Sequence, residues 1–598
     1  MHLRILRWLG KRRLKYQPAN SQLADLASRL AQVFACLLVL LPAAAQAQQT
    51  IQPAYDPRQF EQRFDGSQSG RTDAPRPGVP VPRLASPAMP PADPTPLFVL
   101  RHLSIAGATA VPADRLASAY QSYIGKKVSQ ADLANIAAGI SELYRAAGFH
   151  LSRAIIPPQD ISHGSVRVQV IEGSITAVDL KGEGAEEFGV RRMLLPVLSE
   201  RPSRLTTLER KLLLISARPG VRIEDATLEE IGKTSGHFRL TVFVKTWHVY
   251  TSFGIDNLGA SAVGPWQSYA TVAYNSLLAP GDTLAVNLST IPNDPRELAF
   301  GRLSYDTPIG NDGLRVGASG IYSSVWPGDF RHALADNTLT EALEIRASIA
   351  AIQSQRSSLT FTTALDISNV SESTMFGPVY SDRIRTFGLT SDYRLQDNFG
   401  GNNYFTATWR QGLNIFGASP ADDSFVSHFG ASPSFSVLDV WYTRYQSLAD
   451  AWSLKIAGAG QAASGPLYLS QQFYLGGAAF GRGYSAAETS GDNGMAGTLE
   501  LRFDQKLNSR FMSGYQLYSF VDSGVAWNSG FRYTDGISLV SVGGGIRFFL
   551  SNNTQADLAV AVPLSYRSPD NQGRDLRVLF SVTSALEFCP ARTSSRCL

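Results

Sequence analysis

Apolar and polar residues alternate along the C-terminal part of the chain, from residue 247 to residue 588. In the segment 284–289, apolar Leu, Val and Leu alternate with Ala, Asn and Ser, and the segments 405–410 and 499–504 repeat the pattern. A period of two predicts β-strands that have one apolar and one polar face. A water-soluble sheet with one wet face would show the same alternation, so the pattern alone leaves the class of sheet open.

Two further observations favour a membrane barrel. Charged residues gather in clusters on the polar faces, and the sequence after residue 247 predicts no helices that could cover the apolar faces. We therefore predict a transmembrane β-barrel that is apolar outside and polar inside. At ~20 residues for each strand and its connection, the region would form about 16 antiparallel strands, an even number.

Residues 98–173 predict a compact α+β unit with the element order β-α-α-β-β. Ser129 and Asp132 are spaced as a capping box, and apolar residues at helical spacing follow them until Gly148, which ends the helix. Strands are predicted at residues 150–156 and 165–171.

Residues 174–245 repeat this order. Thr206 and Glu209 predict a second capping box at the start of a helix. Gly232-Lys-Thr234 resembles the end of a phosphate-binding loop, but Thr227 stands where the first glycine should be, so we interpret the segment as a surface turn. Strands are expected at residues 175–180 and 238–244, and a further helix near residues 188–198.

The first 47 residues have the features of a secretory signal peptide. A basic region precedes an apolar run from Val33 to Leu41, and Ala45-Gln-Ala47 fits a signal peptidase site. The run is shorter than the ~20 residues that a membrane-spanning helix needs, so we expect export and loss of Cys36 with the signal. Of 54 Lys and Arg residues, seven lie in this leader, against one of 50 Asp and Glu residues. The remaining chain is slightly acidic, which argues against a nucleic-acid partner.

Residues 48–97 predict a short helix followed by a spacer. Asp56-Pro57 starts a segment that places Phe60 and Phe64 at helical spacing. Nine prolines between Pro75 and Pro96 then predict a stiff, extended linker. A disordered mature N-terminus is the alternative interpretation of the helical segment.

The sequence shows no motif for catalysis or for a cofactor. The eight histidines are scattered, no metal-ligand spacing is present, and no Gly-x-Ser-x-Gly motif occurs. Cys589 and Cys597 could form a disulfide or remain as two thiols. We therefore predict no enzymatic activity, no metal site and no small-molecule cofactor.

One cation stands out within the predicted barrel. Arg482 lies between two glycines in the segment Phe480–Tyr484, and Asp522 is a candidate counter-ion further along the chain. Glycines permit a tight loop that penetrates deeply. The segment also matches a weak form of the dinucleotide-binding fingerprint, but no βαβ unit follows it, which argues against a nucleotide site.

These motifs resemble those of the outer-membrane transporters of two-partner secretion, the TpsB family of haemolysin and adhesin secretion proteins. The resemblance extends from about residue 50 to residue 588. It implies two polypeptide-transport-associated (POTRA) domains in the periplasm, an N-terminal plug helix in the lumen, and a long loop that folds into the barrel. It also implies that Arg482 on this loop pairs with Asp522.

The resemblance assigns further residues to motifs. The inward-loop motif comprises Gly481, Arg482, Gly483 and Tyr484; the associated motif comprises Gly491, Asp492, Gly494 and Gly524; the plug helix carries Phe60 and Phe64; and the motif of the first POTRA domain comprises Tyr144, Gly148, Phe149, Pro158, Gln159, Glu172 and Gly173.

The implied function is a pore in the outer membrane that secretes one dedicated exoprotein, of the adhesin or haemolysin type. Implied contacts are outer-membrane lipid or lipopolysaccharide and, during biogenesis, the barrel assembly machinery. The expected domains are a signal peptide (1–47), the plug and linker (48–97), the two POTRA domains (98–173 and 174–245), the barrel (246–588) and a C-terminal tail (589–598).

The chain departs from the family pattern at two places. Gly481 replaces a valine, which predicts a looser loop tip, and a tail follows Phe588, whereas the family's last strand ends in an aromatic residue that serves as the assembly signal. The main alternative function is a factor that assembles or inserts outer-membrane proteins, since such factors share the POTRA domains and the Arg-Gly motif. A surface enzyme on a barrel is less consistent with the sequence, because no catalytic motif is present. A passive porin is also less consistent, because a porin would not need two periplasmic modules.

Overall fold

The computed structural model of the 598-residue chain describes residues 64, 79–82, 93–161, 163–232, 235–507, 509–529, 536–551, 553–565 and 576–588. All of them belong to one compact unit, residues 51–598. The predicted signal peptide, Phe60 and the C-terminal tail lie outside the described residues, and so does most of the proline-rich linker.

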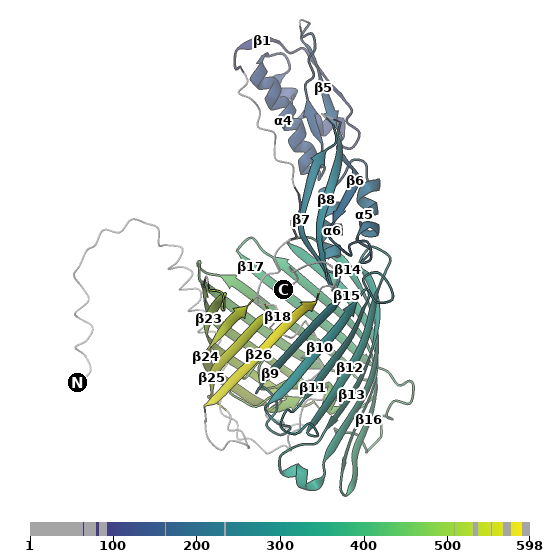
Figure 1. Cartoon of the computed structure of the whole chain (residues 1–598), viewed down its shortest axis with the longest axis vertical. Coiled ribbons are helices and arrows are strands. Elements are labelled where there is room, and N and C mark those ends of the chain that lie inside the picture. Colours follow the sequence, from purple (N-terminus) through teal and green to yellow (C-terminus); the bar gives the residue numbers. More distant parts are fainter. Residues whose placement is uncertain are drawn as a thin grey trace, which may run out of the picture. The chain divides into compact units, whose positions relative to one another are not determined.

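Within the described part of the chain, sixteen antiparallel strands close into a barrel (Figure 1). The last strand pairs with the first, which confirms the predicted fold class. The strands are β9 (Val249–Asp256), β10 (Gln267–Asn275), β11 (Thr283–Thr290), β12 (Leu298–Ile309), β13 (Leu314–Val325), β14 (Asn337–Gln353), β15 (Ser357–Thr374), β16 (Gly377–Gln396), β17 (Gly401–Gly412), β18 (Ser436–Ser447), β19 (Trp452–Ala463), β22 (Asn493–Lys506), β23 (Gly514–Trp527), β24 (Ile537–Ser551), β25 (Thr554–Pro563) and β26 (Arg577–Phe588).

The alternation of the sequence sets the two faces of the barrel wall. Val286 and Leu288 on β11 are 38% and 53% exposed on the outside, whereas the lumen face carries residues such as Glu344, Asp366 and Arg394. A cavity of about 1200 Å³ runs between these polar side chains. The chain enters the barrel at Val249, and we call this end of the barrel the near end and the opposite end the far end.

The first α+β module packs two helices on short sheets. β1 (Pro96–Val99) pairs with β3 (Lys127–Ser129), and a second sheet has the order β2-β5-β4, with β2 at His102–Ala106, β4 at Arg153–Ile155 and β5 at Ser165–Ile171. The helices are α3 (Ala113–Ala117) and α4 (Gln130–Ala146), with a 3-10 turn, η2 (Gln121–Tyr123), between them. The capping box of Ser129 and Asp132 is present at the start of α4, as predicted.

The second module repeats this architecture with one three-stranded sheet of order β6-β8-β7. Its elements are β6 (Ser174–Lys181), α5 (Val190–Ser199), α6 (Leu205–Ser216), β7 (Val221–Glu230) and β8 (His237–Thr246). Strand β7 had no separate sequence prediction, because its apolar residues are interrupted by charged ones. Among the described residues, no helix is long and apolar enough to cross a membrane.

The predicted capping box of Thr206 and Glu209 is wrong. Helix α6 has Arg204 as its N-cap residue, without a side-chain cap, so Thr206 lies inside the first turn. The carboxylate of Glu200 instead accepts from the backbone N–H of Arg204 at 2.9 Å. Glu209 accepts from the backbone N–H of Gln355 and is therefore not available to the helix start.

Candidate inward-loop site

The loop between β19 and β22 folds back on itself as a short hairpin. Strand β20 (Phe473–Leu475) follows a 3-10 turn, η4 (Leu469–Gln471), and pairs with β21 (Thr489–Gly491). The residues between these strands form the loop tip that carries the inward-loop motif. Gly476 and Gly477 begin this tip with φ angles of 107° and 88°, a conformation that glycine adopts without steric cost.

Arg482 at the tip contacts Asp522 on β23 through three donors. Its backbone N–H and its Nε each lie 2.9 Å from Asp522 Oδ2, and its Nη2 lies 2.7 Å from Oδ1. Arg482 is 8% exposed and Asp522 is fully buried. The guanidinium also stacks on Phe520, with 3.4 Å between the Cζ atom and the ring centroid. The two residues that the sequence paired are therefore in direct contact.

Strand β22 supplies two further partners that the sequence analysis missed. Arg482 Nη1 donates to Glu500 Oε2 at 2.6 Å, and Nη2 donates to Thr498 Oγ1 at 2.8 Å. With Asp522 and the ring of Phe520, these contacts surround the guanidinium. The available signal was that Thr498 and Glu500 occupy alternate positions on the polar face of a strand whose apolar face had been identified.

Glu500 extends these contacts into an ionic cluster of six residues. Arg502 Nε donates to Glu500 Oε1 at 2.8 Å, and Arg547 Nη1 donates to the same oxygen at 3.0 Å. Arg547 Nε in turn donates to Asp557 Oδ2 at 2.8 Å. The ionic cluster balances three cations against three anions, which is what buried charges require. Its members are Arg482, Glu500, Arg502, Asp522, Arg547 and Asp557.

Other residues of the motif hold the tip against β24 and β26. Tyr484 donates its hydroxyl to the carbonyl of Val540 at 3.0 Å, and its own carbonyl accepts from Arg577. A Cβ on Gly483 would lie 2.8 Å from the Cβ of Ser541, so glycine allows the tip to approach the wall closely. The inward-loop motif therefore contacts strands β22, β23, β24 and β26 on one side of the barrel.

The backbone conformation at position 481 favours glycine over the valine of the family pattern. Its φ angle is 88°, in a region that β-branched residues rarely adopt. The backbone N–H of Gly477 donates to the Gly481 carbonyl at 3.3 Å, and that of Tyr484 donates to it at 2.9 Å. The left-handed turn at Gly481 is therefore part of the hydrogen bonding of the tip. The predicted loosening of the tip stays a prediction.

The associated motif fixes the base of the hairpin. Asp492 is fully buried and accepts from the backbone N–H groups of Leu467 and Ser529 at 2.9 and 2.8 Å. It thereby joins three segments of the far end. The glycines leave room for the hairpin to lie on the barrel wall: an added Cβ would lie 2.5 Å from Trp527 N at Gly491, 2.1 Å from Phe473 Cδ1 at Gly494, and 2.5 Å from Leu475 Cδ1 at Gly524.

Phe64 is the one predicted plug residue that the structure describes, and it packs inside the barrel. Its ring stacks on Phe300 of β12 at a centroid distance of 5.7 Å and meets Tyr269 of β10 edge-on at 6.5 Å. The same apolar cluster includes Ala486 of the loop tip. Phe60 lies outside the described residues, so the plug helix stays a prediction.

Side chains reinforce the closing seam between β9 and β26 near Phe64. Tyr269 reaches across Gly254 on β9 to Thr583 on β26, with 2.9 Å between their hydroxyl oxygens. A Cβ on Gly254 would lie 2.4 Å from the ring of Tyr269, so a glycine at this position leaves the space in which the tyrosine side chain crosses β9. Beyond the last backbone pair, Asn257 donates through Nδ2 to Val578 O at 2.9 Å and accepts through Oδ1 from Phe580 N at 2.7 Å.

The motif of the first module forms a separate polar site around Glu172. Its carboxylate accepts from the backbone N–H of Thr109 at 2.6 Å, from that of Ala110 at 2.7 Å, and from the Tyr144 hydroxyl at 2.7 Å. Burial opposes ionisation of Glu172, but these hydrogen bonds outweigh it and lower its pKa. Burial, with the bond to Glu172, raises the pKa of Tyr144.

The other residues of this motif are structural. Gly148 adopts a φ of 91° after α4, Phe149 is buried under the guanidinium of Arg204, and a Cβ on Gly173 would lie 2.3 Å from Leu151 O. Gln159 exchanges two hydrogen bonds with the backbone of Arg167, which closes the turn that contains Pro158. They stabilise the module and do not meet the residues of the inward-loop site.

Comparison with known proteins identifies this architecture. The family model described as "Haemolysin secretion/activation protein ShlB/FhaC/HecB" matches residues 239–548, and the ShlB-type POTRA domain matches residues 98–173. The chain belongs to the ShlB/FhaC/HecB family. As a member of this family it is an outer-membrane transporter of two-partner secretion whose POTRA domains are periplasmic, as predicted. The near end of the barrel is thus periplasmic and the far end extracellular.

The relatives of this chain include outer-membrane transporters from several bacteria. The heme/hemopexin transporter protein HuxB of Haemophilus influenzae is 25% identical over 469 residues, 76% of this chain and 81% of HuxB. The outer membrane transporter CdiB of Dickeya dadantii is 20% identical over 491 residues, 79% and 84% of the two chains. The structure of CdiB from Escherichia coli shares the fold, with a TM-score of 0.67, 17% identity, and coverage of 96% and 100%.

Proposed function

We propose that this transporter secretes one dedicated exoprotein and that the docked inward loop is required for its passage. The observation that supports the proposal is the buried contact of Arg482 with Asp522 and Glu500, which joins a loop of the extracellular end to the lumen wall. Charges are buried only when they are paired, so the loop has one strongly preferred position.

The periplasmic modules supply a reception surface for an unfolded partner. The sheet of the first module has β2 and β4 at its edges, and the sheet of the second has β6 and β7. An extended chain can add to such an edge through main-chain hydrogen bonds, with modest demands on its sequence. On β7, a bulge near Glu224 and the exposed charges of Asp225 and Glu229 oppose non-specific pairing, so we assign the partner to an edge other than β7.

The N-terminal segment closes the resting pore in this proposal. Phe64 places part of that segment against β10 and β12, beside Ala486 of the loop tip. The segment leaves the lumen when the partner enters, and the proline-rich linker gives it the reach to do so. Folding of the partner outside the cell drives the passage, since the sequence contains no nucleotide-binding motif.

HuxB is named as a heme/hemopexin transporter, whereas the name of CdiB gives no substrate, so the partner of this chain has to be identified by experiment. Deletion of this protein is expected to leave one large exported protein in the periplasm while the other outer-membrane proteins keep their normal levels. General depletion of outer-membrane barrels would instead assign the chain to membrane-protein assembly. During its own biogenesis the barrel is expected to meet the assembly machinery through strand β26, and in the membrane it contacts outer-membrane lipid.

A further inference from the structure

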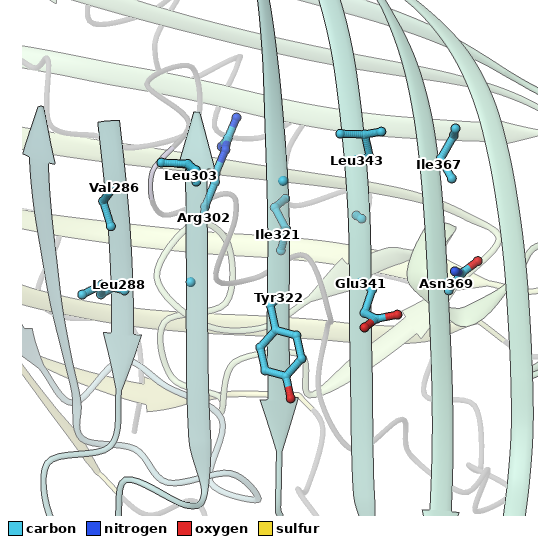
Figure 2. A pocket seen from close by; sticks show the side chains of 13 residues that line it. Val286, Leu288, Arg302, Leu303, Ile321, Tyr322, Glu341, Leu343, Ile367 and Asn369 are labelled. Carbon is cyan, nitrogen blue, oxygen red and sulfur yellow. The ribbon is translucent and has the colours of Figure 1, made fainter. Parts of the chain in front are cut away.

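A hollow of about 540 Å³ lies on the outer wall of the barrel, over strands β11 to β15 (Figure 2). Two rows of paired outward residues form it: Leu288, Gly301 and Tyr322 in one row, and Leu303, Gly320 and Leu343 in the next. Val286 and Ile367 complete its apolar lining. The two glycines form the floor, because each stands where its neighbours in the row carry large side chains.

The fold does not require glycine at either position. Neither Gly301 nor Gly320 has a positive φ angle. A Cβ on Gly301 would have Leu288 Cδ2 as its nearest neighbour at 3.8 Å, and a Cβ on Gly320 would meet no atom within 4 Å. Glycine inside a strand weakens the strand, and it often marks a place that a ligand approaches closely. The missing side chains therefore point to an occupant of the hollow.

Polar residues lie at the extracellular side of the hollow. Glu341 on β14 lies nearer to the extracellular end than Leu343, and it pairs with Asn369 on β15, which pairs with Arg383 on β16. Glu341 and Arg383 are exposed on the outer wall. Asn369 is held in place by Arg385, whose Nη1 donates to its Oδ1 at 3.0 Å. The hollow is thus apolar toward the membrane centre and polar toward the outer surface.

We propose that this hollow binds one acyl chain of an anionic saccharolipid of the outer leaflet. The chain fills the space above Gly301 and Gly320. Its head group lies against the polar row, where Glu341 and Asn369 meet hydroxyl and amide groups and Arg383 meets a phosphate. A phospholipid of the inner leaflet would direct its head group toward the periplasmic end, away from this row. The proposal depends on the outer-membrane location and not on the secretion mechanism.

The test measures lipid that stays on the full-length protein. Wild-type protein, the variant G301L/G320L and the control G458L/G497L are reconstituted with lipid A, extracted in mild detergent and analysed by native mass spectrometry. The control replaces Gly458 on β19 and Gly497 on β22, two outward glycines that pair with each other away from the hollow. Added Cβ atoms at these positions would lie 3.4 and 3.5 Å from their nearest neighbours. Heat-modifiable migration on gels checks that each barrel is folded.

We expect one retained lipid A on the wild type and on the control, and at least tenfold less on G301L/G320L. R383Q is expected to lower retention of lipid A but not of a neutral diacylglycerol. Equal retention by all three proteins, or none by the wild type, would overturn the proposal. A wild-type dimer that G301L/G320L dissociates would also overturn it, because the hollow would then be a contact between copies. Should G301L/G320L not fold, G320L alone is compared with G458L.

Discussion

Two sides of the barrel differ in how they are held together. Strands β14, β15 and β16 have 17, 18 and 20 residues, and long runs of backbone pairs join them. On the other side, β9 has only eight residues, and the inward loop, the ionic cluster and the side-chain contacts of the seam are concentrated on β9 and β22 to β26. We call these the tall side and the docked side.

The difference shows which side depends on individual side chains. On the tall side each strand has many backbone hydrogen bonds, and the loss of one side chain removes a small fraction of them. On the docked side, β9 has only eight backbone pairs with each of its neighbours, and a few buried charges and amide groups on this side supplement the backbone pairing. A single substitution on the docked side should change both the position of the inward loop and the stability of the seam. An equivalent substitution on the tall side should have little effect on either.

The largest effect is expected for Arg482→Ala. It leaves Asp522 without its buried counter-ion, while Glu500 keeps Arg502 and Arg547. The cost is ~3 kcal/mol, which changes the ratio of docked to undocked loop by about a hundredfold. The exoprotein in the medium should fall strongly while the barrel stays inserted. Arg394→Ala is the control, because Arg394 also lines the lumen, on the tall side, and stacks on Tyr404. An equal loss of secretion in the two variants would show that the docked side is no more sensitive to substitution than the tall side.

A smaller effect is expected for Glu500→Gln. The amide leaves an excess of cations around Arg482, but Asp522 still accepts three hydrogen bonds from that residue. We expect roughly 2 kcal/mol less stability and a partial loss of secretion. Urea unfolding of the reconstituted barrel measures the first quantity, and the exoprotein in the medium measures the second. A secretion defect larger than that of Arg482→Ala would contradict the central place of Arg482.

Asn257→Ala tests the extracellular end of the seam. It removes two side-chain hydrogen bonds to β26, each worth about 1 kcal/mol. The amide of Phe580 should exchange with solvent on the order of tenfold faster, or more. Asn257→Asp keeps the acceptor oxygen but loses the donor, so its effect should be intermediate. Unchanged exchange in both variants would show that backbone pairing alone holds the seam.

The smallest effect is expected for Tyr269→Phe. This change removes the hydrogen bond to Thr583 but keeps the ring over Gly254 and against Phe64. The loss should be about 1 kcal/mol, seen as faster amide exchange at the seam. Thr408→Val on β17 removes a comparable bond of 3.0 Å to Thr390 on β16, at the border of the tall side, and should leave exchange unchanged. Equal responses of the two variants would argue against a weaker seam.

The sequence predicted the barrel well because its signal is local. A period of two, charges gathered on the polar faces and the lack of predicted helices to cover the apolar faces led to a closed barrel, and the strand number followed from the length of the region. The contact of Arg482 with Asp522 came from the resemblance, since no local rule states how deep a loop reaches. Glu500 was visible as a charge on a polar face, but its role depends on the register of β22 with β23, which sequence alone does not give.

Other features depend on long-range or competing contacts. Asn257 contacts Val578 and Phe580, more than 300 residues away, so its position could not be predicted without the closure of the barrel. The capping box at Thr206 failed because the N-cap residue is Arg204, two residues earlier, and Glu209 has another partner. The left-handed φ of Gly481 is a property of the folded loop tip, although a glycine in place of valine was a hint of it.

The central claim is that docking of the inward loop is needed for secretion. Ser485 of the tip lies 3.2 Å, between hydroxyl oxygens, from Ser261 of the loop after β9. The yield of a disulfide between S261C and S485C, with Cys589 and Cys597 replaced by serine, therefore reports docking. The account predicts that disulfide yield and secretion fall together when Arg482→Ala is added, and stay high with Arg394→Ala. Normal secretion by an Arg482→Ala protein that no longer forms the disulfide would contradict it.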